Sequence, residues 1–120
     1  MPQPLLARGE IDFEPGAPGF ERAVVHAYLE DATEADAPAR VVAEQHTAVG
    51  PRSAGSPATI PFALNGPPLD GSRAHYVRVH VDVSGTGSVR KGDFVSTQSY
   101  SVRPSQLPVE LRIRVRWVRP

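Results

Sequence analysis

The chain contains no cysteine and only one methionine, one tryptophan and one lysine among its 120 residues. The lack of cysteine excludes a disulfide framework, a thiolate metal site, a cysteine nucleophile and a lipid-modified cysteine in the sequence as written. No apolar run approaches the ~18 residues that a membrane span needs. The formal net charge at pH 7 is zero, so the excess of base typical of nucleic-acid-binding proteins is also missing.

Residues 1–8 lack the basic region and the apolar stretch of ~7–15 residues that define a signal peptide. We therefore expect a cytoplasmic protein if the sequence is taken as it stands, and a cell-envelope protein if a signal segment has been removed. Charge is nevertheless uneven, because residues 1–60 have a net charge of −5 and residues 61–120 a net charge of +5. Pairing between these halves is the simplest explanation.

Seven segments alternate apolar and polar residues, and none has a convincing helical period. The 13 prolines and 10 glycines fall between these segments, which is typical of turns. The expected strands are about residues 6–13, 22–30, 40–46, 59–64, 75–83, 94–102 and 109–118. Seven short strands with one apolar face each predict an all-β fold. We expect one domain over residues 1–120, an immunoglobulin-like sandwich of two packed antiparallel sheets with its core in about residues 6–118.

The same alternation assigns the core and the outward faces. The predicted core residues are Ile11, Phe13, Val25, Leu29, Ile60, Phe62, Val77, Val79, Val81, Leu111, Ile113, Val115 and Trp117. Acidic and arginine side chains should face each other across the first and last strands, from Glu10, Asp12 and Glu14 to Arg112, Arg114 and Arg116. Opposite charges on adjacent strands would fix the register there.

The chain resembles the YbaY/YscW family of small bacterial β-sandwich proteins. The resemblance rests on four segments, LEDATEADAPARVVAEQ (29–45), IPFAL (60–64), HYVRVHVDV (75–83) and VELRIRVRWV (109–118). It implies an immunoglobulin-like sandwich and a relation to cell-envelope lipoproteins, among them pilotins that assist assembly of a secretion-system pore. Because the sequence as written has no lipidated cysteine, the anchored pilotin role is not expected to transfer with the fold.

One segment has the pattern of a calcium loop, from Asp82 to Asp93. Oxygen-bearing residues stand at positions 1, 3, 5 and 12 of twelve, namely Asp82, Ser84, Thr86 and Asp93, and Gly87 stands at the sharp turn at position 6. Only two of these are carboxylates, two basic residues follow, and no flanking helices are expected. The alternatives are weak calcium binding and a plain glycine-rich hairpin; no other cofactor is indicated.

The acidic stretch between the second and third strands offers four carboxylates, Glu30, Asp31, Glu34 and Asp36. General acid–base catalysis needs a pKa raised by burial, which we do not expect on an exposed crossover. Side-chain caps to backbone N–H groups by Asp31, Thr33 and Asp36 are the simpler interpretation.

The four histidines give no ligand pattern by spacing alone. His75 and His80 should lie on opposite faces of one strand, and His26 and His80 can meet only if their strands are neighbours. A nucleophile elbow and a phosphate-binding loop before a helix are both missing. No residue is therefore predicted to be catalytic.

These observations predict a non-enzymatic accessory or protein-interaction module that binds an unidentified protein partner, without nucleic acid and without a membrane span. The alternative is a domain that binds a small ligand or weakly binds calcium through the loop at residues 82–93. A hydrolase is the least favoured reading.

Overall fold

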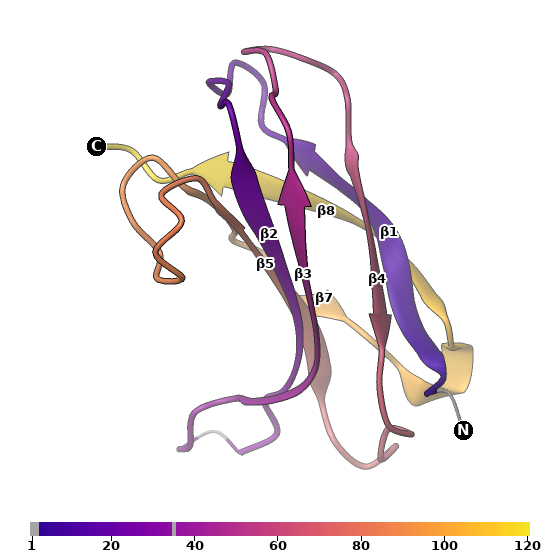
Figure 1. The fold of residues 1–120 in the computed structure, drawn as a ribbon. Coiled ribbons are helices and arrows are strands. Elements are labelled where there is room, and N and C mark those ends of the chain that lie inside the picture. Colours follow the sequence, from indigo (N-terminus) through magenta and orange to yellow (C-terminus); the bar gives the residue numbers. More distant parts are fainter. Residues whose placement is uncertain (1–2, 35) are drawn as a thin grey trace.

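The computed structural model describes residues 3–34 and 36–120, and it folds into one strongly curved β-sheet (Figure 1). The strands are β1 (Leu5–Phe13), β2 (Ala23–Asp31), β3 (Arg40–Val49), β4 (Ile60–Asn65), β5 (His75–Asp82), β6 (Phe94–Ser96), β7 (Tyr100–Ser101) and β8 (Val109–Trp117). A 3-10 turn, Pro104–Gln106, precedes β8. Within the described residues, no helix has the length and apolar character required to cross a membrane. Residues 1, 2 and 35, from the N-terminal segment and the acidic crossover, lie outside the described residues.

The strands follow one path across the sheet, in the order β3, β2, β5, β6, β8, β1, β4, and β7 pairs with β5 beside this path. Adjacent strands are antiparallel except β1 and β8, which are parallel. The two ends of the path, β3 and β4, come close enough for the backbone N–H of Ala63 to donate to Gln45 Oε1 at 3.0 Å. The sheet is therefore a nearly closed barrel.

The prediction of an all-β fold is confirmed, but the prediction of an immunoglobulin-like sandwich of two antiparallel sheets is wrong. A sandwich requires a break between two sheets, and here the three-residue strand β6 bridges β5 to β8 without one. Alternation of apolar and polar residues shows which face of each strand is buried. A barrel and a sandwich both bury one face of every strand, so alternation does not distinguish these two folds.

Most predicted strands lie within a few residues of their expected positions, and the exception is the segment 94–102. It forms two short strands, β6 and β7, separated by residues 97–99. The pairing of β5 with β6 stops after Val95, because the backbone N–H of Val79 donates to the Ser96 hydroxyl at 2.9 Å instead of to a backbone carbonyl. The chain then leaves the ladder and returns to β5 further along.

The predicted inward faces are the buried faces. Ile11, Leu29, Val79 and Ile113 are fully buried. The predicted core residues Ile60, Leu111 and Trp117 pack against this core but stay partly exposed. At one end of the barrel the ring of Phe94 meets that of Phe13 edge to face, with centroids 4.9 Å apart.

The parallel contact of β1 with β8 depends on a glycine and on a shared carboxylate. A Cβ atom at Gly9 would collide with the backbone oxygen of Leu111, so only glycine allows this approach. Asp12 accepts hydrogen bonds from Arg112 Nε at 2.9 Å and Arg114 Nε at 3.0 Å. The bond from Arg114 lowers the pKa of Asp12 most, and burial opposes this effect only in part.

The register of the predicted acid–arginine ladder is confirmed, since Glu10 pairs with Arg112 and Asp12 with Arg114 across β1 and β8. Within the described residues, however, only Asp12 forms ion pairs with these arginines. Glu10 accepts from the hydroxyl of Thr59 at 2.7 Å, on the side of β1 that faces β4. Glu14 accepts from the backbone N–H of Trp117 at 3.0 Å. Glu10 and Glu14 therefore accept hydrogen bonds from uncharged donors, Thr59 and the backbone of Trp117, which the charge pattern of the sequence does not predict.

Candidate functional site

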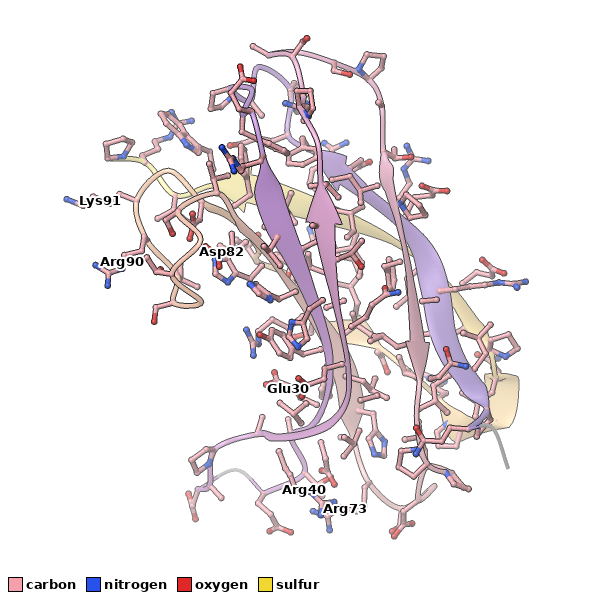
Figure 2. All side chains as sticks on the ribbon, in the orientation of Figure 1. Glu30, Arg40, Arg73, Asp82, Arg90 and Lys91 are labelled. Atoms are coloured by element: carbon pink, nitrogen blue, oxygen red, sulfur yellow. The ribbon has the colours of Figure 1, made fainter. Side chains whose placement is uncertain are left out.

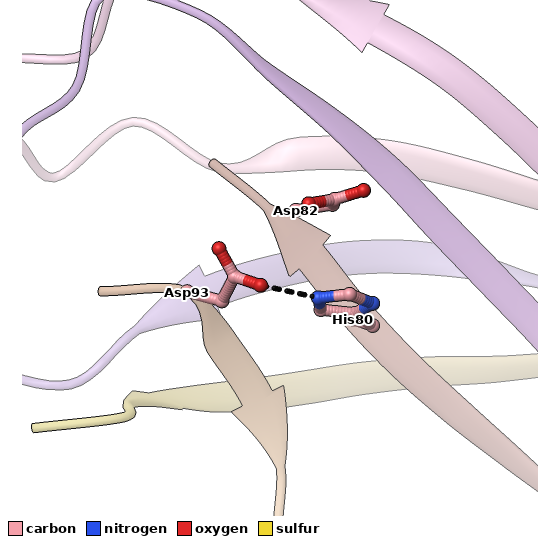
Figure 3. Close-up of side chains that lie close together, drawn as sticks. All are labelled: His80, Asp82 and Asp93. Carbon is pink, nitrogen blue, oxygen red and sulfur yellow. Dashed lines mark hydrogen bonds and ion pairs between the residues drawn. The ribbon is translucent and has the colours of Figure 1, made fainter. Parts of the chain in front are cut away.

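The most polar buried region lies where β5 leads into the connection at residues 83–93. Asp82 ends β5 and Asp93 immediately precedes β6, and Figure 3 shows the Asp93 carboxylate directed at the ring of His80 on β5. Both residues are buried, at 2% and 0% exposure. The loop can wrap around them because three of its glycines have positive φ: Gly85 (73°), Gly87 (83°) and Gly92 (95°).

The Asp93 carboxylate is surrounded by donors. Its Oδ1 accepts from the backbone N–H groups of Val83 and Ser84, both at 3.0 Å. Its Oδ2 accepts from His80 Nε2 at 2.8 Å and from the backbone N–H of Arg90 at 3.0 Å. This single side chain therefore holds both ends of the loop to β5.

The Asp82 carboxylate has a comparable set of partners. Its Oδ1 accepts from the backbone N–H of Gly85 at 2.8 Å and from the Ser84 hydroxyl at 3.0 Å. Its Oδ2 accepts from the backbone N–H of Gly87 at 2.9 Å and from His26 Nε2 at 3.0 Å. Asp82 thereby joins the loop to β2.

Burial alone would raise the pKa of both aspartates, but the hydrogen bonds outweigh it. The bonds from His26 and Gly87 bring the pKa of Asp82 well below its ordinary value. The bonds from His80 and Ser84 likewise lower the pKa of Asp93. At neutral pH both side chains are therefore anions that only accept hydrogen bonds.

The structure brings the predicted calcium ligands together. Asp82, Ser84 and Asp93 share hydrogen bonds, and Thr86 Oγ1 lies 3.3 Å from Ser84 Oγ. His80 joins this group, since one ligand atom each of His80, Asp82 and Asp93 lie within 4.8 Å of one another. However, N–H and O–H donors point at the carboxylate oxygens that a cation would use. Calcium binding stays a prediction, and the donors favour carboxylates that organise the loop.

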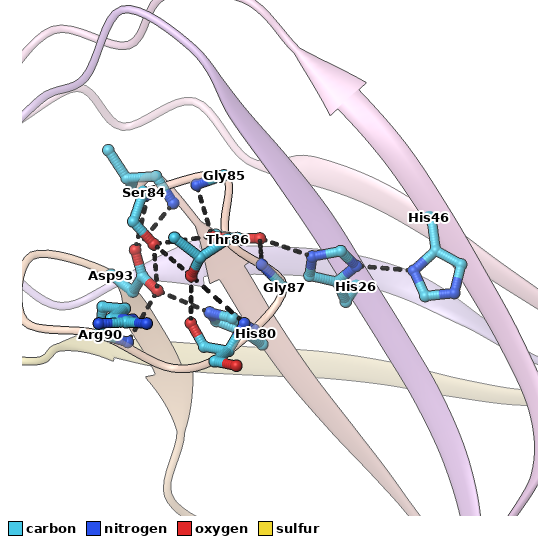
Figure 4. A network of polar contacts seen from close by, with 12 residues as sticks. His26, His46, His80, Ser84, Gly85, Thr86, Gly87, Arg90 and Asp93 are labelled. Carbon is cyan, nitrogen blue, oxygen red and sulfur yellow. Dashed lines mark hydrogen bonds and ion pairs between the residues drawn. The ribbon is translucent and has the colours of Figure 1, made fainter.

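Three histidines lie in a row across adjacent strands beside this loop (Figure 4). In the strand register, His26 on β2 pairs with His46 on β3 on one side and with His80 on β5 on the other. The condition for contact between His26 and His80 is thus met, with ring centroids 5.3 Å apart. The place of His46 in the row could not be predicted, because the register between β2 and β3 is not visible in the spacing.

Two of these histidines, His26 and His46, form a continuous polar chain with an acidic group at each end. His26 Nδ1 lies 2.6 Å from His46 Nδ1. The other ring nitrogen of His46, Nε2, lies 2.7 Å from Glu44 Oε1. The other ring nitrogen of His26 contacts Asp82. The side chain of His26 is 12% exposed and that of His46 is 42% exposed, so the chain runs from the buried loop to the surface of β3.

The acidic crossover forms a second polar cluster, at the opposite end of β2 (Figure 2). Asp31 accepts from the backbone N–H of Thr33 at 3.0 Å and from its hydroxyl at 2.7 Å, which confirms the predicted cap. Arg73 Nε also contacts Asp31, and Arg40 Nη2 lies 3.6 Å away. The hydrogen bonds from Arg73 and Thr33 hold the pKa of Asp31 far below its ordinary value.

The expectation that this whole stretch is exposed is wrong for Asp31, whose side chain is 2% exposed. Its burial follows from its position at the end of β2, on the same face as Leu29. Glu30 lies on the opposite face and binds Arg78 at 3.1 Å, and Glu34 binds Arg73 at 3.3 Å. These carboxylates therefore have arginine partners, and this arrangement favours a structural role over acid–base chemistry.

A hollow of about 370 Å³ opens where β3 ends and β4 begins. Its lining includes the apolar side chains of Phe20, Val49 and Ile60 and the guanidinium of Arg52. Arg52 is held in place by bonds to backbone oxygens and by its position 4.1 Å above the ring centroid of Phe13.

Comparison with known proteins gives one informative likeness. The structure is similar to an alternative pilotin from the type II secretion system of Vibrio cholerae, with a TM-score of 0.70 and 23% sequence identity over 95% of this chain and 96% of the pilotin. No family model and no curated protein matches the sequence. The likeness shows that a small bacterial pilotin has this fold, and membership of the YbaY/YscW family stays a prediction.

Proposed function

We propose that this chain is a non-enzymatic accessory protein that binds a subunit of a bacterial secretion system in the cell envelope. The observation that carries the proposal is the match to a pilotin over almost the full length of both chains. A match of this extent means that the two proteins share the whole domain and not one common supersecondary unit.

The free edge of β3 is the best candidate for the binding surface. Among the described strands, β3 pairs only with β2, so its other edge has unpaired backbone groups along Arg40–Val49. An edge of this kind is a template for an added strand of a partner. The edge of β4 is less suitable, because Pro61 has no N–H and the N–H of Ala63 already binds Gln45.

The hollow at the end of β3 lies next to this edge and could receive a side chain of the partner segment. Val49 is the last residue of β3 and also lines the hollow, together with Phe20 and Ile60. An extended partner segment that pairs with β3 would place a side chain near this pocket, and its apolar lining favours an aliphatic or aromatic residue. The partner is thus an extended, partly apolar protein segment.

The test is a binding titration with the purified pore-forming subunit of the host's own type II secretion system. We expect the wild-type chain to bind, and we expect Val49→Arg to weaken binding at least about tenfold, because it fills the pocket with charge. Glu110→Gln on the exposed face of β8 is the matched control and should bind as the wild type does. Absence of binding by the wild type contradicts the proposed role, whereas equal binding by Val49→Arg contradicts the proposed surface.

A further inference from the structure

The contact between His26 and His46 cannot be an ordinary bond between two neutral rings. His26 Nε2 faces the Asp82 carboxylate at 3.0 Å, and His46 Nε2 faces Glu44 Oε1 at 2.7 Å. A carboxylate accepts but does not donate, so each Nε2 must carry the hydrogen. In neutral rings both Nδ1 atoms are then unprotonated, and they lie 2.6 Å apart with their lone pairs facing each other.

Two facing lone pairs at this distance repel unless a positive charge lies between them. We infer that His26 and His46 form a binding site for a borderline divalent transition-metal ion such as Zn²⁺ or Cu²⁺, with Nδ1 of each ring as a ligand. Imidazole nitrogen is a preferred ligand for these ions and is a poor one for calcium or magnesium.

The surroundings of the two rings support a metal ion. In metal sites a ligating histidine usually donates its other N–H to a carboxylate, which fixes the tautomer and increases the basicity of the ligand. Both rings have such a partner here, Asp82 for His26 and Glu44 for His46. The two carboxylates also supply two negative charges to offset the charge of the ion. Arg78, a neighbouring cation, is paired with Glu30 and lies over the ring of Tyr28.

The geometry needs only a small adjustment. Zinc–nitrogen bonds of about 2.0–2.1 Å place two tetrahedral ligand atoms about 3.3 Å apart, so the rings must separate slightly from their 2.6 Å contact. His26 is fixed by Asp82, but His46 lies on the edge strand β3 with 42% of its side chain exposed and can rotate. The same exposure gives the ion a path of entry from solvent and allows water molecules to fill its remaining coordination positions.

This site differs from the group formed by His80, Asp82 and Asp93. In that group the His80 Nε2 and both carboxylates are engaged with one another and with the backbone of the loop. The facing Nδ1 atoms of His26 and His46, in contrast, have only each other within the described hydrogen bonds. The inference does not depend on the secretion-system role.

Isothermal titration of zinc chloride into the full chain at neutral pH tests the site. We expect one ion per chain, an affinity at least about tenfold lower in His46→Gln, and a loss of ~10–100-fold in Glu44→Ala, where only the partner of the ligand is removed. Both residues are exposed on an edge strand, so these variants should fold. His75→Gln, which removes a histidine from the opposite face of β5, should bind zinc as the wild type does.

Imidazole NMR signals of the wild-type chain give a second measurement that does not depend on any variant. Zinc should shift the ring signals of His26 and His46 and leave those of His75 unchanged. The inference is overturned if millimolar zinc produces no binding, which would leave a single shared proton between the rings. It is also overturned if His46→Gln binds zinc with unchanged affinity, or if the shifts are confined to His80, which would place the ion in the other group.

Discussion

Two buried aspartates, one at the end of β2 and one immediately before β6, are stabilised in different ways. Asp31, at the acidic crossover, has arginine partners, chiefly Arg73. Asp93, at the far loop, has backbone N–H groups and His80. Arginine stays charged at every working pH and acts from a distance through its charge, whereas backbone N–H groups bind only if the chain has one particular path. The crossover is therefore held chiefly by ion pairs with arginine, together with the cap from Thr33. The far loop is held by hydrogen bonds that its backbone can form in only one conformation.

The largest expected effect is at the far loop. Asp93→Asn replaces one of the two carboxylate oxygens by an NH₂ group. Either His80 and the backbone N–H of Arg90, or the backbone N–H groups of Val83 and Ser84, then lose their acceptor. A buried donor that is left unsatisfied costs ~1–3 kcal/mol. Because two donors are affected, we expect the free energy of unfolding in urea to fall by about 2–5 kcal/mol. Asp36→Asn on the exposed crossover is the control and should leave the unfolding midpoint unchanged. A loss no larger than that of the control would show that the loop does not depend on this carboxylate.

A smaller effect is expected at the crossover, and pH should reveal it. The folded-state pKa of Asp31 is lowered, chiefly by Arg73. Its contribution to stability is therefore complete above the unfolded pKa of about 3.9 and is lost as the pH falls through the folded value. In Arg73→Gln the folded-state pKa of Asp31 rises toward its ordinary value. The free energy of unfolding of this variant should therefore fall less than that of the wild type as the pH is lowered.

Urea unfolding of the wild type and Arg73→Gln between pH 7 and about pH 2 measures this difference. The two midpoints should differ most at neutral pH and should converge in acid, and high salt should also bring them closer because it screens the ion pair. Arg103→Gln, an exposed arginine near the 3-10 turn, serves as the control. A gap that stays constant from neutral to acid pH would mean that Arg73 acts by packing and not through the charge of Asp31.

The smallest effect is expected for calcium at the far loop. The oxygens of Asp82 and Asp93 already accept hydrogen bonds from the loop, and binding an ion would require these bonds to break. We expect calorimetric titration to detect no heat of binding at millimolar calcium. Heat that appears in the wild type and disappears in Asp82→Ala would instead establish the calcium site that the twelve-residue spacing predicts.

The strands and their buried faces could be predicted because alternation is a local property. Each predicted core stripe, such as that of Val77, Val79 and Val81, is the buried stripe. Closure of the sheet could not be predicted in this way. It depends on which strands are neighbours, and above all on the short β6, which pairs with β5 on one side and β8 on the other.

The candidate site was predictable in part for the same reason. The loop pattern correctly brings Asp82, Ser84 and Asp93 together, because they are close in sequence. The histidine row is different, since His26 and His46 meet only through the register of β2 with β3. A contact of this kind becomes visible only after the strands have been paired.

The parallel pairing of β1 with β8 has a mechanical consequence. The first strand begins and the last strand ends at opposite ends of the molecule (Figure 1). A force that pulls Leu5 and Trp117 apart would slide the two strands past each other, so the hydrogen bonds from Ala7 to Phe13 would be loaded together instead of opening one at a time. A domain held from both ends would therefore resist extension through this one strand pair, and a substitution at Gly9 that separates the strands would remove the resistance.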